Sequence, residues 1–481
     1  MATIGTENLT PGALLELVAR GNKDAFFLSK DVAKAESPFN TIYAPQEPRL
    51  ADTRTQVPSN APDFGKMIEF QLETWADILT DMYVLIDLPS WLPSLPLVAD
   101  GTTYPPQESN LQNLVTSSSE AEYTYGWIRG IGYLLFERIQ ILQDQFLIQD
   151  ISGDSLLALE NTSSTNAQYY LRAAQAGIHN GTAREIGANA TPGRLRVRIP
   201  FPCLQRPADG GLPLCCLREQ NFRIRFFLRS AEKLWESSAP AGTVVPAPWN
   251  TTFNVFSTTG TIVEGVGGAG RSALGKPNIM LETTQIYISE DAANQMRAQY
   301  FKIPFIRYYD ETFTIGEADY AAIDRGGTSV IQRRMEGRHP MERLMIYFRR
   351  KQWLSDGRLW LLGGEEFYNN IGFQIAGQDR EYIWPSAVLH TITGLVKDER
   401  YMADRGQQEL RWSIPEGIGY NRQPTGTVNF TTASRPTLSI DLKDSEPDPC
   451  DDQRTTFMQI VGEAWAIYEI KEGRGRLMFM D

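Results

Sequence analysis

The sequence predicts an all-β protein built from consecutive antiparallel sandwiches, and three observations lead to that fold class. Apolar and polar residues alternate with a period of two in many short segments. Helical periodicity is confined to a few short stretches. The 39 Gly, 28 Pro and 11% aromatic residues favour short strands joined by many turns. A chain of 481 residues is long enough for two or three separate cores.

The first expected element is a short N-terminal helix. Thr10 is its expected N-cap, Pro11 its first residue, and a glycine ends it ten residues later. Leu14, Leu17 and Val18 share one face of this helix. Because a helix of about ten residues is marginal alone in water, we expect this face to dock on another surface.

The strands are the most clearly patterned elements. In FRIRFFLR the apolar residues at even positions form one face, while Arg223 and Arg225 lie on the other. Burial of each apolar side chain stabilises such a sandwich by roughly 1.5–3 kcal/mol. The other segments with the same alternation are KMIEFQLET (66–74), RLRVRIPF (194–201) and LSIDLK (438–443). We interpret each as an antiparallel strand with one face in a core and one towards water or a partner.

A second helix is expected in the middle of the chain, at SEDAANQMRAQ (289–299). It follows the strand MLETTQIYI and precedes another strand-rich half, so we place the domain boundary there. The expected organisation is an N-terminal arm at 1–24, a first domain at 25–292 and a second at 293–481.

Long connections interrupt the strands at 89–122, 205–213 and 230–275. Loops of this length in a compact domain are usually functional surface insertions. The connection DSEPDPCDD (444–452) is acidic. We interpret it as a solvated loop, because the ligand spacing and turn glycine of a calcium site are missing.

Composition restricts the class of protein further. The net charge of −12 makes bulk electrostatic binding to nucleic acid unfavourable. The start of the sequence lacks the layout of a secretory signal, and no segment has the roughly 20 apolar residues of a membrane span. Four cysteines in 481 residues fit reduced thiols, and the adjacent Cys215 and Cys216 in LPLCCL are expected in a core.

The glycine-rich segment GVGGAGRSALGKP (265–277) contains G-x-G-x-x-G and resembles a phosphate-binding loop. Pro277 stands where that loop needs Ser or Thr, and proline disfavours a helix at Lys276. The residues that follow, NIMLETTQIYIS, are strand-like, so no helix dipole would face a phosphate. We therefore expect a loop and no nucleotide site.

No catalytic, metal-binding or cofactor-binding residues are expected. His179, His339 and His390 lie far apart, and none has metal-ligand spacing. His339 precedes a strand and is interpreted as structural. The basic clusters Arg333-Arg334 and Arg349-Arg350-Lys351 could contact phosphates. In an acidic protein we expect them instead to pair with carboxylates or lie at interfaces, where arginine is favoured. Paired carboxylates cannot be recognised without a fold, but nothing positive indicates an enzyme.

Local phrases in the correct order resemble the double jelly-roll major capsid proteins of nucleocytoplasmic large DNA viruses. The resemblance runs over nearly the whole chain, and its most specific phrase is QPTGTVNFTTASRPTLSIDL (423–442), although Thr431-Thr432-Ala433 departs from the family pattern. QDREYIWPSAV (378–388) matches only in outline. The other phrases are GALLELVARGNKDAFF (12–27), YTYGWIRGIGYLLFERIQILQDQFLIQDISGDSL (123–156), PFPCLQRPADGGLPLCCLREQNFRIRFFL (200–228), MLETTQIYISEDAANQMRAQ (280–299) and HPMERLMIYFRR (339–350).

This resemblance implies two consecutive eight-stranded jelly rolls, a fold that leaves few sheet edges exposed. It implies a structural protein of the virion capsid, assembled in the host cytoplasm as homotrimeric, pseudo-hexameric capsomers. The implied partners are further copies of the chain, minor capsid proteins and an inner membrane, with no direct contact to nucleic acid.

Three other functions remain open at this stage. A minor or vertex capsid paralogue would have the same fold. A carbohydrate-binding jelly-roll protein could show the same alternation, but would expose a groove lined by Trp or Tyr. A jelly-roll enzyme would need a convergent metal or carboxylate cluster, for which the sequence offers no His or Cys set.

Overall fold

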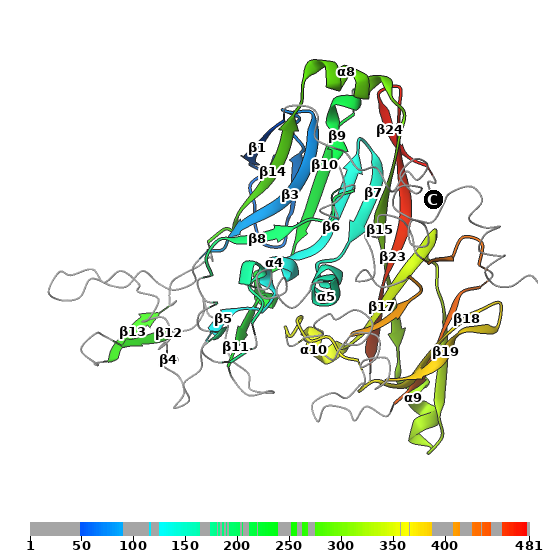
Figure 1. The fold of residues 1–481 in the computed structure, drawn as a ribbon. Helices are drawn as coiled ribbons and strands as arrows, with labels where there is room; N and C mark the ends of the chain where they lie inside the picture. The colour runs from blue at the N-terminus through cyan, green and yellow to red at the C-terminus, as the bar shows by residue number, and fades with distance from the viewer. Residues whose placement is uncertain are drawn as a thin grey trace, which may run out of the picture.

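Two β-sandwiches stand side by side in the computed structural model of the chain (Figure 1). The structure describes residues 49–89, 115–116, 125–163, 174–179, 181–182, 185–186, 189, 192–202, 204, 211–218, 220–238, 252–256, 262–267, 275–355, 357–364, 366–386, 407–413, 426–433, 435–443 and 455–478. The expected N-terminal helix, with Leu14, Leu17 and Val18, lies outside these residues.

The first roll consists of two facing sheets whose strands all pair antiparallel. One sheet has the order β1-β14-β3-β8, and the other has the order β2-β10-β6-β7. The strands are β1 (Leu50–Gln56), β2 (Met67–Gln71), β3 (Ile78–Asp87), β6 (Phe136–Gln143), β7 (Phe146–Ile151), β8 (Leu195–Arg198), β10 (Phe222–Leu228) and β14 (Asn278–Tyr287).

The second roll repeats this arrangement. Its sheets have the orders β15-β23-β17-β20 and β16-β22-β18-β19. The strands are β15 (Phe301–Ile315), β16 (Ser329–Arg334), β17 (Pro340–Arg350), β18 (Tyr368–Ile375), β19 (Gln378–Pro385), β20 (Gln407–Arg411), β22 (Thr437–Leu442) and β23 (Thr456–Lys471).

The two rolls share one connectivity. The eight strands of each roll can be numbered in chain order. In both rolls, one sheet then has its strands in the order first, eighth, third, sixth. The other sheet has its strands in the order second, seventh, fourth, fifth. The expected fold of two consecutive eight-stranded antiparallel jelly rolls is confirmed.

The alternation in the sequence corresponds to the two faces of these strands. Along β10 the burial alternates residue by residue, and Phe226 packs edge-on against Phe70 of β2. On the outer face Arg225 binds Glu69 at 2.6 Å. On the neighbouring sheet Arg196 of β8 binds Glu282 at 2.6 Å. The arginine-rich faces are therefore paired with carboxylates on other strands of the same sheet.

Strand β17 behaves differently, because its sheet is covered on both sides. Leu344, Ile346 and Phe348 point into the core of the second roll. Met345 and Tyr347 point the other way and belong to the cluster that forms the core of the first roll. A strand covered on both faces shows continuous burial, as β17 does from Met341 to Arg349.

Helix α8 (Glu290–Ala298) connects the rolls and spans one end of both (Figure 1). Its N-cap Ser289 accepts a hydrogen bond from the Ala292 N–H, and Glu290 and Asp291 lie in its first turn. The expected interdomain helix is thus confirmed. Other helices in the described chain include α4 (Ile131–Leu134), α5 (Gly153–Ser163), α9 (Glu317–Asp324), α10 (Lys351–Ser355), η1 (Leu214–Cys216) and η2 (Ala231–Lys233). None of them has the length and apolar character needed to cross a membrane.

The long connections contribute strands of their own. Strand β4 (Val115–Thr116) pairs with β12 (Thr252–Phe256), which pairs with β13 (Ile262–Gly267). This small sheet joins the connections 89–122 and 230–275, which we expected to be long surface loops. The remaining short strands are β5 (Tyr125–Trp127), β9 (Leu212–Pro213), β11 (Trp235–Ser237), β21 (Val428–Asn429) and β24 (Arg474–Leu477).

The glycine-rich segment is partly a strand, which corrects our expectation of a loop throughout. Gly265 to Gly267 end β13. Residues 268–274 lie outside the described part of the chain. Strand β14 begins at Asn278, directly after Pro277, so the residues after the segment form a strand, as the sequence predicts.

Candidate functional site

The interface between the two rolls, which we call the roll interface, contains several buried polar side chains, among them Gln149, Asp154 and Arg349. Its centre is the contact of β7, an edge strand of the first roll, with β15, an edge strand of the second. Edge strands carry backbone groups that no further strand of their own sheet satisfies. The polar side chains of the interface satisfy several of these groups.

Gln149 on β7 is the clearest example. Its side-chain Nε2 donates to the Tyr308 carbonyl at 3.1 Å, and its Oε1 accepts from the Tyr308 N–H at 3.1 Å. Gln149 is only 1% exposed. The amide side chain thus takes the place of a neighbouring strand at one residue of β15.

A second glutamine forms the same pair of side-chain to backbone hydrogen bonds near the other end of the interface. Gln220, just before β10, accepts from the Gly475 N–H at 2.6 Å and donates to the Gly475 carbonyl at 3.3 Å. Tyr468 of β23 donates its hydroxyl to Gln143 at 2.9 Å. The two rolls are therefore joined by hydrogen bonds with defined directions, as well as by apolar packing.

A buried carboxylate connects three segments of the interface. Asp154, in the first turn of α5, lies 2.7 Å from Arg229 of the first roll and 2.9 Å from Arg349 of β17. Burial opposes ionisation of Asp154, but the charges of Arg349 and Arg229 outweigh it and lower its pKa. Arg349 is 1% exposed, so its charge depends on this carboxylate for compensation.

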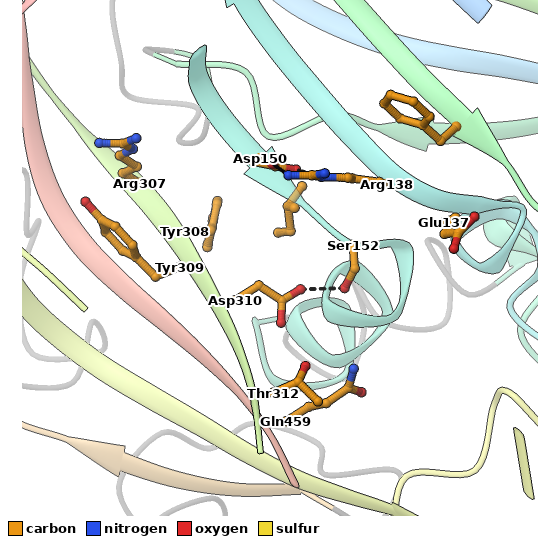
Figure 2. A pocket seen from close by; sticks show the side chains of 12 residues that line it. Glu137, Arg138, Asp150, Ser152, Arg307, Tyr308, Tyr309, Asp310, Thr312 and Gln459 are labelled. Atoms are coloured by element: carbon orange, nitrogen blue, oxygen red, sulfur yellow. Dashed lines mark hydrogen bonds and ion pairs between the residues drawn. The ribbon is translucent and has the colours of Figure 1, made fainter. Parts of the chain in front are cut away.

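Asp310 of β15 also contacts the start of α5. Its Oδ2 accepts hydrogen bonds from Ser152 at 2.6 Å and Ser155 at 2.7 Å, and Figure 2 shows the first of these. Ser152 also accepts from the Ser155 N–H at 3.1 Å, which caps the start of α5. Desolvation raises the pKa of Asp310, and the nearby Asp154 acts in the same direction.

An open cleft of about 680 Å³ runs along this contact, between β6 and β7 on one side and β15 and β23 on the other (Figure 2). Arg138 and Asp150 form a bidentate pair at its wall, with an Nε–Oδ1 distance of 2.7 Å. The described lining contains neither histidine nor cysteine. Its main polar residues are Glu137, Arg138, Asp150, Ser152, Arg307, Asp310, Thr312 and Gln459. In this lining Arg138 is engaged with Asp150, and Asp310 with the hydroxyls of Ser152 and Ser155.

A further contact lies at the end of the interface away from α8. The guanidinium of Arg129 stacks on the ring of Trp360, 3.2 Å from its centroid. Arg129 also lies 3.5 Å from Glu236, which pairs with His179 at 2.9 Å. Arginine over tryptophan is the most favourable cation–π combination, so this contact also ties the second roll to the first.

Comparison with known proteins identifies the fold. No protein-family model and no curated protein sequence matches the chain. Solved structures do match. A subunit in a quasi-atomic model of the PBCV-1 virus capsid superposes with a TM-score of 0.64 at 14% identity, over 92% of this chain and 100% of the other. The Faustovirus major capsid protein gives 0.60 at 11% identity, over 95% of this chain and 96% of the other.

This is the double jelly-roll fold of viral major capsid proteins. The structure of the Sputnik virophage also matches, with a TM-score of 0.53 at 10% identity over 91% of this chain and 90% of the other. The similarity extends through both rolls of the double jelly roll and the connection between them.

Only part of the roll interface could be predicted from the sequence. In the basic clusters, Arg349 binds Asp154 and Arg333 binds Asp319 at 3.2 Å, so the expected pairing with carboxylates is confirmed for these two arginines. The residues that sequence reasoning missed are Gln149, Ser152, Asp154, Ser155, Gln220 and Asp310. One signal was available: Ser152 precedes GDSLLALENTS, which has the form of a capped helix.

Further sequence predictions concern the histidines, the cysteines and the acidic connection. His339 lies directly before β17, where its N–H donates to Thr431 Oγ1 at 2.8 Å. Cys216 is buried in the core as expected, whereas Cys215 is only half-buried. His390 and the acidic connection 444–452 lie outside the described residues. In the described ranges no group of three or more His, Cys, Asp or Glu side chains could hold a metal ion.

Proposed function

We propose that this chain is the major capsid protein of an icosahedral large DNA virus. The observation that carries the proposal is the repetition of one eight-strand order in two rolls that share a buried interface. Two similar rolls per chain let three chains present six similar lobes, which is the outline that a hexagonal lattice requires. The fold shared with the Faustovirus major capsid protein supports the same function.

The proposed capsomer is a homotrimer. Heterologous contacts that close after three subunits generate such a ring. The contact between subunits would bury more than about 2,000 Å² and be apolar at its centre, as in other obligate assemblies. The roll interface contributes indirectly, because it fixes the angle between the two lobes of each chain before any subunit contact forms.

The proposed role is structural and not enzymatic, and its location is the virion capsid after assembly in the host cytoplasm. In support, the buried Asp154 and Arg349 are engaged with each other across the roll interface. We also propose that the chain divides into an arm at 1–24, a first roll at 25–292 and a second at 293–481. The division at 292/293 falls within α8, which serves both rolls as a connector.

The N-terminal arm is proposed to attach the capsomer to its surroundings. Leu14, Leu17 and Val18 would dock beneath the shell on a neighbouring subunit, a minor capsid protein or the inner membrane. Deletion of residues 1–20 tests this role: trimers should persist while shell assembly weakens. Unchanged shell assembly would refute it.

Size-exclusion chromatography with light scattering tests the proposed function. The expected result is a heat-resistant particle with three times the mass of the 481-residue chain. A stable monomer that binds a sugar array would instead support a carbohydrate-binding protein. The number of copies per virion distinguishes the main shell component from a minor or vertex paralogue.

A further inference from the structure

Two adjacent cysteines lie where the first roll meets the connecting helix. Cys215 and Cys216 belong to η1, and their Sγ atoms are 3.8 Å apart. Both thiols are free. Cys216 is 3% exposed and packs in the core, whereas Cys215 is half-buried and can be reached from solvent.

Backbone contacts tie this pair to two other elements. The Cys215 N–H donates to the Asp77 carbonyl at 3.0 Å, and the Cys215 carbonyl accepts from Arg297 Nε of α8 at 3.2 Å. Figure 1 shows α8 next to β9, the strand that leads directly into η1. A change in the conformation of the Cys215–Cys216 peptide would therefore alter its hydrogen bond with α8, the helix that connects the rolls.

The two thiols differ in reactivity. A hydrogen bond from Cys216 lowers the pKa of Cys215, and the nearby charge of Arg297 acts in the same direction. The same hydrogen bond, together with burial, raises the pKa of Cys216. The thiolate is the nucleophile in disulfide exchange, so Cys215 is the residue that attacks first.

We infer that Cys215 and Cys216 form a reversible oxidation site that reacts with small-molecule disulfides and changes how η1 holds α8. In the first step the Cys215 thiolate attacks one sulfur of the reagent, forms a mixed disulfide and releases one thiolate. In the second step Cys216 loses its proton to solvent and attacks Cys215 Sγ, which releases the second thiolate. The protein loses two hydrogens and two electrons, and the reagent disulfide is reduced to two thiols.

The geometry of adjacent residues makes this site reversible. Neighbouring Cα atoms are about 3.8 Å apart across a trans peptide, whereas disulfides usually join Cα atoms about 4.4–6.8 Å apart. Such a bond is strained and readily reduced. Closing it requires the 215–216 peptide to rotate, which removes the contacts of Cys215 with Asp77 and Arg297. We expect the oxidised protein to have a Tm lower by about 2–4 °C.

The test uses the full chain with Cys203→Ser and Cys450→Ser, so that only the adjacent pair remains. We expect oxidised glutathione to remove two hydrogen masses from the peptide that contains residues 215 and 216, and dithiothreitol to restore them. An additional Cys216→Ser substitution should trap a glutathione adduct on Cys215, because no second thiol resolves it. An additional Cys215→Ser substitution should slow any reaction by about tenfold or more.

A second reagent tests the geometry without oxidation. One molecule of a trivalent phenylarsenoxide should bridge both thiols of the folded protein and block the reaction with glutathione. The inference is overturned if both thiols survive oxidised glutathione, if they react only in urea, or if Cys215→Ser reacts as fast as Cys216→Ser. Oxidation without any change in Tm would remove the proposed link to α8.

Discussion

Gln149 of the first roll holds the backbone of Tyr308 in the second through two hydrogen bonds of 3.1 Å each. An amide side chain presents one donor and one acceptor at the spacing of a peptide group, so it can complete an edge strand at one position. Gln220 does the same at Gly475. The rolls are thus joined by glutamine side chains that take the place of a neighbouring strand. Because hydrogen bonds have defined directions, they restrict the relative position of the rolls more than apolar packing alone.

Replacing Gln149 by leucine should destabilise the protein strongly. The substitution leaves the N–H and C=O of Tyr308 without their partner, at a cost of about 1–3 kcal/mol for each group that stays buried. Thermal and urea unfolding measure the effect. The matched control is Gln71→Leu on the exposed face of β2, which should change the free energy of unfolding by less than about 0.5 kcal/mol. Equal effects at both positions would show that Gln149 does not hold the roll interface.

Asp154→Asn should destabilise the protein strongly. It leaves Arg229 and Arg349 without the carboxylate that both bind, and breaking a buried ion pair costs about 3–5 kcal/mol. Asp150→Asn provides the comparison, because its partner Arg138 is more than half exposed and such pairs contribute about 0–1 kcal/mol. Unfolding curves that rank the two variants in the opposite order would contradict the assigned role of Asp154.

The two carboxylates of the interface predict opposite responses to pH. The pKa of Asp154 is lowered, so its stabilisation is present above the ordinary value of 3.8 and is lost as pH falls through the lower, folded value. The pKa of Asp310 is raised, so its ionisation costs stability once pH rises past 3.8 and through the higher, folded value.

Asp310→Asn isolates the second effect. At pH 7 the variant should melt at a higher temperature than the original protein, because asparagine keeps an acceptor for the serine hydroxyls and carries no charge. The difference should shrink as pH falls through 3.8, below which Asp310 becomes protonated in both the folded and the unfolded state. Melting curves from pH 3 to pH 8 measure it, and a difference that is independent of pH would exclude the titration of Asp310 as its cause.

Gly153→Ala should disrupt the start of α5. A Cβ at this position would lie 2.1 Å from the Phe136 carbonyl oxygen and 2.3 Å from that of Tyr133, and neither backbone atom can move easily. We expect a loss at the upper end of the range of about 1–3 kcal/mol for overpacking. Gly316→Ala is the control, since a Cβ there has no neighbour within 4 Å. If both variants unfold at the same temperature, the close approach at Gly153 is not a constraint on the fold.

The strands that face water on one side could be predicted from the sequence. The alternation in FRIRFFLR specifies β10 and its two faces, because a period of two distinguishes a half-buried strand from a helix. The partners of its arginines could not be predicted. Arg225 reaches Glu69 through a strand pairing that joins residues 156 positions apart. Strand β17 was expected after His339, but its two covered faces could not be predicted, because burial on both sides removes the alternation.

The roll interface was largely hidden from sequence reasoning for a related reason. Gln149 and Asp310 are ordinary polar residues of edge strands, and their role arises only because β7 and β15 come together. Arg349 was recognisable as a residue for a carboxylate or an interface, but its partner Asp154 lies on a helix that the sequence analysis did not assign. The face formed by Leu14, Leu17 and Val18 remains a prediction.

The central claim is that the two rolls of each chain act as similar lobes of a trimeric capsomer. Electron microscopy of the purified particle tests this claim most directly. An epitope inserted between Ala376 and Gly377, in the exposed turn between β18 and β19, would mark only the second roll. Class averages viewed along the symmetry axis, with an antibody fragment bound, should show six lobes with every second one labelled. A particle with two lobes, or with six lobes that all carry the label, would contradict it.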